Sequence, residues 1–306
     1  MTFGDLVNDF ETAYMPNLSA PTRSKYASLL RCHVRPEFAG MKVEDVSRRR
    51  IDEWLASKSK DGLSWATRAD LRNLVSSVFT RADLWDTYNG KNPAQKANPG
   101  RKTACYEKRK MSVEQTKRLL HALPPDVRLV CMVALFLGLR ISEVLGLCWK
   151  HIDWDRGMVL IRQRYWRGDL DRTKSEAADR DIPFGNLTDL LSKLCPGPDA
   201  GERYCFEVRT TKGITRDDRS IRRYFLKPAA EKLGINYKGF GFHAFRREAV
   251  TAIAGKTDAI QASRLAGHTR MDVTLLYGLD DYARQERAIK SNQEPYVTAG
   301  LLGVAK

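Results

Sequence analysis

Apolar residues recur at helical spacing through the first part of the chain. Phe3, Leu6, Val7 and Phe10 would share one face of a helix, because residues three and four positions apart lie on the same side. The same spacing predicts three more helices: one that begins at Ser19-Ala20-Pro21 and stops at Pro36, one entered through Ser47 that buries Ile51, Trp54 and Leu55, and one from about Ser64 to Trp85. These residues predict a small all-helical unit.

The helical periodicity lapses between about Tyr88 and Lys110. This segment contains Asn89-Gly90, Asn92-Pro93 and Asn98-Pro99-Gly100, and then a run of basic residues. Gly, Pro and Asn at this density are typical of irregular structure. We therefore expect a basic linker between two domains.

The second half of the pattern mixes helices with short strands. Ser112 and Gln115 have the spacing of a capping box, and Gly138 would end the strongly apolar helix at about 126–137. Alternation over Met158-Val159-Leu160-Ile161 predicts a strand. The other expected elements are a helix at 141–149, a polar segment that turns back through 171–183, a short strand at 204–206, and helices at about 217–233, 243–255, 258–266 and 272–291.

Together these elements predict a mainly α-helical protein with a small antiparallel β-sheet in its second domain, an α+β architecture. A length of 306 residues suits two domains. We expect a helical domain at 1–88, a basic linker at 89–110, a second domain at 111–292 and a tail at 293–306. The segment from Glu294 onward is expected to form no element of its own and to be flexible or to dock on a neighbouring copy.

Composition excludes several classes of protein. No apolar run approaches the 18 or so residues that a membrane span needs, and Met1-Thr2-Phe3-Gly4-Asp5-Leu6 lacks the features of a secretory signal. Six cysteines are scattered without a C-x-x-C pair, which favours reduced thiols and no metal site. We expect a cytoplasmic protein.

The charge distribution points to a polyanionic partner. The formal net charge is +15, of which +3 falls in residues 1–100 and +12 in the rest. Residues 101–110 alone carry five basic side chains and one acidic one. Such a balance indicates binding to nucleic acid, although a merely soluble basic protein has the same signature.

Three separated segments carry candidate chemistry. Arg140 stands at a helix junction after Gly138, and Glu143, one turn on, would brace its guanidinium group. His243 and Arg246 lie three apart on a predicted helix, so both would project from one face. Two guanidinium groups can hold the non-bridging oxygens of one phosphate. Each feature alone has a structural alternative. Arg140 and Glu143 could form a surface ion pair, and His243 could be a packed structural histidine.

Tyr277 is the candidate nucleophile. It lies nine residues after His268 on the next predicted helix, which Asp272 would cap. A phenol with a free pKa near 10 is a weak nucleophile at neutral pH, so it needs cationic surroundings. A buried aromatic side chain is the alternative for Tyr277, and Tyr282 is the nearest rival as nucleophile.

At this point the sequence resembles a known family, the tyrosine recombinases or phage integrases. The segments that carry the resemblance are Gly138-Leu139-Arg140-Ile141-Ser142-Glu143, His243-Ala244-Phe245-Arg246, Gly267-His268 with Tyr277, and Thr173-Lys174-Ser175 with Arg180-Asp181-Ile182-Pro183. Their order and spacing match the family's boxes. The helical N-terminal residues are similar to the family's core-binding domain, in the two-domain form without an arm-binding domain. Phe245 stands where the family commonly has Leu.

The resemblance implies a site-specific DNA recombinase that works without metal or ATP. Arg140 and Arg246 would clamp the scissile phosphate, and His268 would hydrogen-bond it. Lys174 would protonate the leaving 5′ oxygen, and His243 would exchange a proton with the nucleophile. Tyr277 would form a covalent 3′-phosphotyrosine bond, and strands would exchange through a Holliday junction. The implied partners are duplex DNA at a specific site, three further copies of the chain in a tetramer, and accessory directionality factors. A bacterial or phage origin and association with the nucleoid are also implied.

Basic residues outside the catalytic set are candidate DNA contacts. Three cations at a helix N-terminus oppose the helix dipole at a cost of a few tenths of a kcal/mol each, which a phosphate backbone would offset. These candidates are Arg48, Arg49, Arg50, Arg101, Lys102, Lys108, Arg109 and Lys110. Two other functions remain open: a type IB topoisomerase-like enzyme that only nicks and reseals, and a non-catalytic DNA-binding protein.

Overall fold

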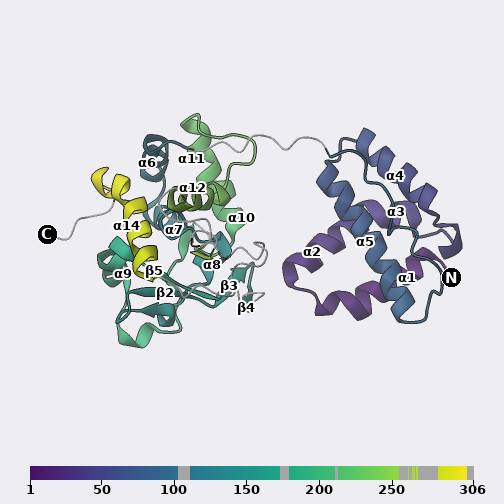
Figure 1. Ribbon diagram of the computed structural model, residues 1–306, viewed down its shortest axis with the longest axis horizontal. Coiled ribbons are helices and arrows are strands. Elements are labelled where there is room, and N and C mark those ends of the chain that lie inside the picture. Colours follow the sequence, from purple (N-terminus) through teal and green to yellow (C-terminus); the bar gives the residue numbers. More distant parts are fainter. Residues whose placement is uncertain are drawn as a thin grey trace. The chain divides into compact units, whose positions relative to one another are not determined.

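The chain forms two compact units, Met1–Tyr106 and Glu107–Lys306 (Figure 1). The computed structural model describes residues 1–102, 111–172, 179–210, 213–254, 261, 264–265, 267 and 282–301. Both units are mainly helical, and the strands lie in the second one. The expected fold class is therefore confirmed. Within these residues no helix has the length and apolarity to cross a membrane.

The N-terminal unit is a bundle of short helices. They are α1 (Phe3–Asp9), α2 (Ala20–Leu29), α3 (Arg35–Phe38), α4 (Arg48–Lys60) and α5 (Trp65–Leu84). Hydroxyl caps set two of the starts, because the Ser47 side chain accepts from the Arg50 amide and the Ser64 side chain from the Thr67 amide. The helices expected from the apolar spacing are confirmed, and Ser19 is the N-cap of α2 as predicted.

Pro36 does not end the second helix, and that prediction is wrong. A wider π-helical turn at Leu30–Val34 follows α2, and α3 then begins with Pro36 in its first turn. Proline has no amide hydrogen to donate, so a helix can contain it only with a local change in its hydrogen bonding, and the wider turn directly before α3 is such a change. The chain therefore stays helical through a residue that we expected to break it.

Large rings fill the core of this unit. Phe3 packs on Phe38 and Phe79 with ring centroids 6.0 and 5.1 Å away, and Phe38 meets Trp54 at 4.8 Å. Gly4 lets α1 approach the end of α3, because a Cβ there would lie 2.7 Å from the Ala39 carbonyl oxygen. The unit therefore has a core of its own.

Residues 92–100 are irregular but are fastened to the helical unit. Ala94 and Ala97 are buried in its core, the Asn98 amide donates to Asp52, and buried Arg68 donates to the Pro99 carbonyl at 2.8 Å. Because a buried guanidinium group needs acceptors, and backbone carbonyls supply them here, Arg68 serves the chain rather than a ligand. This part of the expected linker therefore packs as part of the N-terminal unit.

The second unit combines helices with three small antiparallel sheets. Its helices are α6 (Val113–His121), α7 (Pro125–Phe136), α8 (Ile141–Gly146), α9 (Thr188–Leu194), α10 (Asp218–Ile221), α11 (Lys227–Lys232), α12 (Phe242–Ala254) and α14 (Tyr282–Thr298). Its strands are β1 (Ile152–Asp153), β2 (Met158–Ile161), β3 (Gln163–Trp166), β4 (Asp169–Arg172), β5 (Arg180–Pro183), β6 (Val208–Thr210) and β7 (Gly213–Thr215). The capping box of Ser112 and Gln115 is confirmed, and Gly138 follows α7 with φ +66°.

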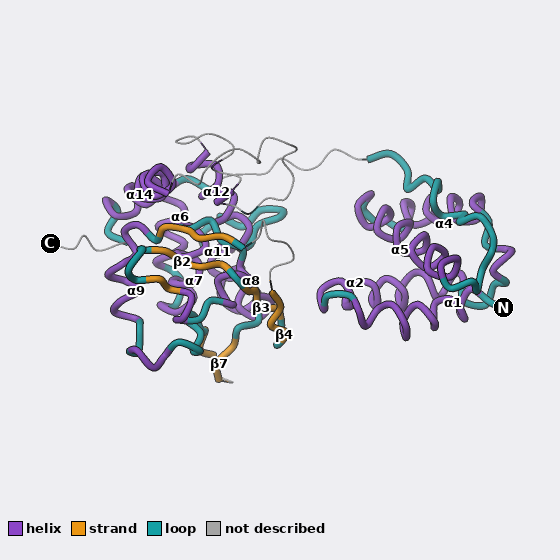
Figure 2. The backbone as a smooth tube through the Cα atoms, turned by 60° about the horizontal axis from the view of Figure 1, so that its bottom comes forward, coloured by secondary structure: helices purple, strands orange, loops and turns teal. Residues whose placement is uncertain are grey.

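Three strands form an antiparallel sheet in the order β1-β2-β5. Figure 2 shows the strands of this unit in orange. The register opposes Val159 to Ile182 and Ile161 to Arg180. Strands β3 and β4 form a separate hairpin, as do β6 and β7. Strand β5 therefore brings Arg180 beside the buried side chain of Ile161.

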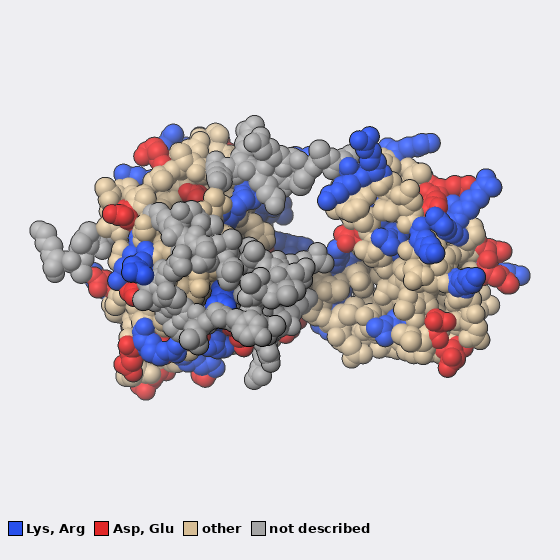
Figure 3. Space-filling model, viewed as in Figure 1, with Lys and Arg blue, Asp and Glu red and all other residues tan. Residues whose placement is uncertain are grey.

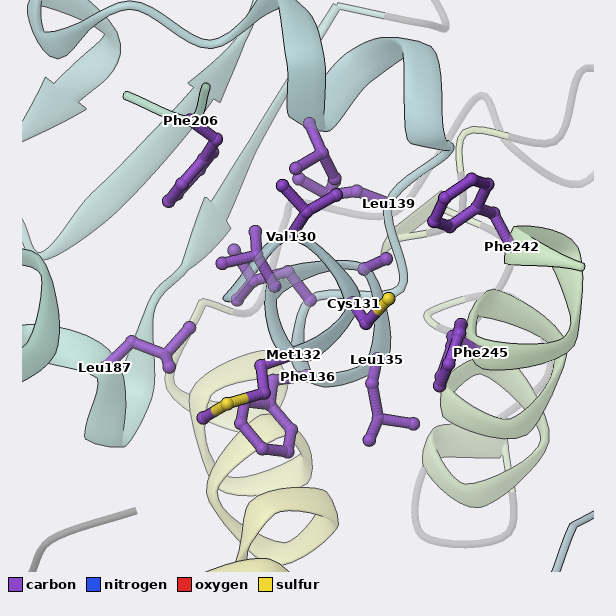
Figure 4. Packing of buried hydrophobic residues seen from close by; sticks show 14 of the residues in the cluster. Val130, Cys131, Met132, Leu135, Phe136, Leu139, Leu187, Phe206, Phe242 and Phe245 are labelled. Atoms are coloured by element: carbon purple, nitrogen blue, oxygen red, sulfur yellow. The ribbon is translucent and has the colours of Figure 1, made fainter. Parts of the chain in front are cut away.

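Helix α7 runs through the centre of this unit's core. Eight of its residues are buried, and in Figure 4 Phe245 of α12 points toward it from one side. Met132 and Phe136 point toward α14 on another side, where Phe136 and Tyr296 lie 5.4 Å apart between ring centroids. The apolar helix expected at 126–137 is thus a core helix surrounded by other elements.

Four details of the second unit differ from the sequence-based expectation. Residues 204–206 form no strand, only an isolated bridge between Cys148 and Tyr204. Helix α8 ends at Gly146, where a Cβ would lie 2.9 Å from the Tyr165 amide nitrogen of β3. Helix α9 was not expected, and α14 continues to Thr298, so the expectation that residues from Glu294 form no element is wrong. Tyr296 is buried, which explains why this segment stays helical.

Candidate active site

Arg140 stands at the start of α8, directly after the turn made by Gly138. Its backbone amide donates to Glu143 Oε2 at 2.8 Å, and its Nη1 donates to Glu143 Oε1 at 2.8 Å. Glu143 is 3% exposed, so the carboxylate is fixed inside the protein. The Arg140 side chain remains 34% exposed. The predicted bracing of Arg140 by Glu143 is confirmed, and it leaves part of the arginine open to a ligand.

Arg246 of α12 reaches the same carboxylate from a segment distant in sequence. Its Nη1 donates to the Gly138 carbonyl oxygen at 2.9 Å and lies 3.6 Å from Glu143 Oε2. The residue is 5% exposed. The fold therefore brings Arg140 and Arg246 together around Glu143, an arrangement suited to gripping one anion from two sides.

His243 lies one turn before Arg246 on α12 and keeps an exposed face. Partial desolvation by the protein around it, and then the charges of Arg246 and Arg140, lower the pKa of His243 below its ordinary value. A histidine with a lowered pKa is neutral at physiological pH. It is therefore able to accept a proton from a neighbouring hydroxyl group.

The charges of this cluster act on one another. Burial opposes the charge of Glu143, but the charge and hydrogen bonds of Arg180, followed by contacts from Arg140, outweigh it and lower the pKa of Glu143 to about 2. Burial, and next the charge of Arg140, lower the pKa of Arg246 to about 9. Glu143 is thus ionised and Arg246 protonated at neutral pH, although the folded protein disfavours the Arg246 charge.

Arg180 is part of this cluster, although the sequence pattern alone predicted no separate role for it. It pairs with Glu143 at 2.9 Å and is 8% exposed. Strand alternation contains the signal that would have found it, because Arg180 and Ile182 share one face and Ile182 would be buried. An arginine on the buried face of a strand needs a buried acceptor, and Glu143 is that acceptor.

Several predicted site residues lie outside the described residues. They are Lys174, His268 and Tyr277 of the catalytic set, and Lys108, Arg109 and Lys110 of the candidate DNA contacts, together with the expected cap Asp272. The described Gly267, which directly precedes His268 in the sequence, accepts a hydrogen bond from Arg140 Nη2 at 3.0 Å. That contact ties the first residue of the third candidate segment to Arg140.

The candidate DNA contacts of the N-terminal unit are exposed, and three of them pair with acids. Arg48 lies 3.7 Å from Asp52, Arg49 2.9 Å from Glu53 and Arg50 2.7 Å from Glu37. Basic and acidic side chains mingle on the visible face of this unit (Figure 3). Ion pairs as exposed as these are weak, so a phosphate can replace the acids. Arg101 and Lys102 are exposed as well, and the Lys102 ammonium lies 5.5 Å from the Trp65 ring centroid.

The described residues hold no cluster of three or more His, Cys, Asp or Glu side chains able to bind a metal ion.

Glu248 lies on α12 but points into the protein. Tyr296 donates to its Oε1 at 2.6 Å, and the Thr116 hydroxyl lies 3.2 Å from both carboxyl oxygens. Burial raises the pKa of Glu248 to about 7, against the lowering effect of those hydrogen bonds. The folded protein therefore holds this proton more tightly than the unfolded chain, whose glutamates titrate near 4.3.

This difference predicts a pH dependence of stability. Between about pH 4.3 and 7 the folded state binds more protons than the unfolded state at Glu248, so its contribution to stability falls as pH rises through that window, by about 3–4 kcal/mol in total. Glu248→Gln mimics the protonated acid, so we expect its melting temperature at pH 8 to exceed that of the wild type, and the difference to vanish at pH 4.

Thermal unfolding followed by circular dichroism at several pH values measures this effect. Glu231→Gln, at an exposed glutamate that pairs with Lys227, is the matched control and should track the wild type. A Glu248→Gln variant with the pH profile of the wild type would contradict the prediction.

Comparison with known proteins adds a family match. The model of the phage integrase family matches residues 109–284, and the model of a phage integrase N-terminal SAM-like domain matches residues 2–59. An integrase of Streptomyces ambofaciens is 23% identical over 89% of this chain and 74% of its own length. A tyrosine recombinase XerC-like protein of Caldanaerobacter subterraneus subsp. tengcongensis is 24% identical over 90% and 78%.

Solved structures share the fold. A Tn1549 transposon integrase in complex with a circular intermediate DNA has a TM-score of 0.71 at 17% identity, covering 94% of this chain and 99% of that one. A lambda integrase tetramer bound to a Holliday junction has a TM-score of 0.67 at 15% identity, covering 92% and 80%. The likeness extends over both units of the chain.

Proposed function

This chain belongs to the phage integrase family and is a tyrosine recombinase, and from that premise we propose that it recombines duplex DNA at a specific site through a covalent 3′-phosphotyrosine intermediate. The observation that carries this proposal is the meeting of Arg140 and Arg246 at Glu143. Two cations held at one point can neutralise the charge that develops on a phosphate during displacement. This arrangement performs the charge stabilisation that a metal ion supplies in other enzymes.

In the proposed cleavage step the Oη of Tyr277 attacks the scissile phosphorus. A bond forms between phosphorus and Oη while the bond from phosphorus to the 5′ oxygen breaks. His243 takes the phenol proton, which its lowered pKa favours at neutral pH. Lys174 gives a proton to the leaving 5′ oxygen. The product is a 3′-phosphotyrosine and a free 5′ hydroxyl.

Arg140, Arg246 and His268 would donate to the non-bridging oxygens throughout this step. Rejoining reverses the chemistry when a 5′ hydroxyl from another duplex attacks the phosphotyrosine. Because one ester replaces another, no external energy source is needed. Exchange of both strand pairs would pass through a Holliday junction in a tetramer, the assembly in which the lambda integrase structure was solved. Accessory proteins would set the direction of recombination.

Adduct formation tests this proposal. We would incubate the protein with a library of nicked duplexes that carry a randomised stretch, and recover protein–DNA adducts after denaturation. The nick lets a short 5′-hydroxyl fragment diffuse away, so the adduct is trapped and its sequence gives the site.

Tyr277→Phe is expected to abolish the adduct, whereas Tyr282→Phe should keep it. An adduct with Tyr277→Phe would refute the assignment of the nucleophile, and no adduct from the wild type would favour a DNA-binding protein without catalytic activity. Relaxation of supercoils without junctions or recombinants from a two-site substrate would favour the topoisomerase-like alternative.

A further inference from the structure

We propose that Arg180 is a positioning residue for cleavage, which acts by holding Glu143 and the chain before His268 in one arrangement. This inference rests on the proposed function, because it concerns the same site. Arg180 lies at the start of β5, and its side chain leaves the strand toward the two arginines that would bind phosphate.

The guanidinium group of Arg180 contacts two segments at once. Its Nη2 donates to Glu143 Oε2 at 2.9 Å and its Nη1 to Glu143 Oε1 at 3.3 Å, a forked contact with the carboxylate. Its Nε donates to the Leu265 carbonyl oxygen at 2.8 Å. A planar group with five donors can make these bonds together, whereas a lysine ammonium has one nitrogen to share.

The contact with Glu143 determines where Arg140 lies. Glu143 uses the same two oxygens to accept from the Arg140 amide and from Arg140 Nη1. Arg180 holds this carboxylate from the other side, so the carboxylate cannot turn without breaking a bond to one of the arginines. The direction of the partly exposed Arg140 side chain therefore depends on Arg180.

The contact with Leu265 fixes the chain near Gly267. Gly267 has a left-handed φ of +59°, and a Cβ there would lie 2.9 Å from Arg180 Nη1. Its amide donates to the Arg264 carbonyl oxygen at 2.9 Å, and its carbonyl accepts from Arg140 Nη2 at 3.0 Å. This turn thus lies against both arginines, and Arg180 joins it to Glu143. We infer that one side chain aligns two of the three segments from which the site is built.

Burial supports a role beyond packing. Arg180 and Glu143 are 8% and 4% exposed, and an apolar pair of similar size would commonly give a core at least as stable. The forked geometry gives a fixed orientation instead, and misplacing a catalytic group by about 1 Å can lower a rate by about 10²-fold.

The test compares Arg180→Ala and Arg180→Lys with Arg156→Ala. Arg156 is a matched control, since it pairs with Asp153 and Asp181 beside the same sheet but is 51% exposed. Single-turnover cleavage and affinity would be measured on a nicked duplex recovered in the adduct selection, below the melting temperature of each variant. We expect cleavage to fall about 10²-fold in Arg180→Ala and at least about tenfold in Arg180→Lys, with DNA affinity within about twofold of the wild type.

Two further readouts separate positioning from folding. The variant Glu143→Gln and the double variant Glu143→Gln/Arg180→Ala should lose similar amounts of cleavage activity. If Arg180 acts through Glu143, the loss caused by Arg180→Ala does not add to the loss caused by Glu143→Gln. Amide hydrogen exchange in a peptide that contains Gly267 should be about tenfold faster in Arg180→Lys, since that variant loses a charge-assisted hydrogen bond. Arg156→Ala should leave both readouts unchanged.

If Arg180→Ala does not fold, Arg180→Lys carries the test, since it keeps a positive charge beside Glu143. Cleavage by Arg180→Lys at the wild-type rate would overturn the inference, as would fully additive losses in the double variant. Absence of an adduct from the wild type would instead overturn the proposed function. Hydrogen exchange at Gly267 would then still decide whether Arg180 holds this turn.

Discussion

Replacing Arg246 with methionine is expected to lower the rate of DNA cleavage by about 10³-fold without lowering the stability of the protein. Loss of one preorganised donor to a developing oxyanion typically costs 10²–10³-fold, and Arg246 is also a full charge at the proposed phosphate site. DNA affinity should change by only a few-fold, because many other cations contact the backbone in such complexes.

The expected effect on stability follows from the electrostatics of the cluster. Burial and the charge of Arg140 lower the pKa of Arg246, so the folded protein holds this cation at a cost. Methionine fills similar space without a charge. The substitution also removes the hydrogen bond to the Gly138 carbonyl, and that loss offsets part of the gain in folding stability. We therefore expect a melting temperature equal to or above that of the wild type.

Arg128 provides the matched control. It too is an arginine that donates to backbone carbonyls, those of Leu120, His121 and Leu123. Arg128→Met should lower the melting temperature and leave cleavage per folded molecule unchanged, the reverse of Arg246→Met. A large drop in melting temperature for Arg246→Met, with cleavage intact in the folded fraction, would assign Arg246 a structural role.

Phe245→Ala is expected to cost about 3–5 kcal/mol of folding free energy. Phe245 is fully buried and points from α12 toward α7 (Figure 4), so its removal leaves a cavity in the centre of the second unit. For a unit of about this size the melting temperature should fall by roughly 10 °C. Thermal and urea unfolding would measure the change.

Phe245→Leu is the control for this prediction. Leucine keeps most of the apolar volume, so a cost of about 1 kcal/mol is expected. Cleavage per folded molecule should survive in both variants at low temperature, because Phe245 belongs to the apolar core and carries no charged or polar group. Equal stability of Phe245→Ala and the wild type would mean that the α7–α12 contact is not packed as described.

Much of the fold could be predicted because local signals and packing agree. Ser47, Ser64 and Ser112 cap helices where their hydroxyl groups and the following apolar spacing indicate a start. The wrong predictions of helix ends arise where a contact with a residue distant in the sequence determines the local structure. Gly146 ends α8 because β3 lies against it, and the residues after Glu294 stay helical because Tyr296 packs on Phe136. No window of the sequence contains those partners.

In the candidate site, too, local contacts could be predicted from the sequence and contacts between distant segments could not. The pairing of Arg140 with Glu143 is local, three residues apart, and it could be read from the sequence. The contacts of Glu143 with Arg180 and Arg246 span two further segments, so only the folded chain reveals them. Resemblance to a family supplied the catalytic assignments, but it gave no role to Arg180.

The carboxylate of Glu143 lies against the guanidinium groups of Arg140, Arg180 and Arg246, and this crowding of charge bears on how DNA would bind. Without substrate, Arg140 and Arg180 repel Arg246 inside a nearly closed space. On the proposed function, the negative charge of a phosphate diester would relieve that repulsion, so binding of DNA and the stability of the folded cluster would be thermodynamically linked. The scissile phosphate would therefore complete the charge balance of a cluster that its hydrogen bonds already hold in place.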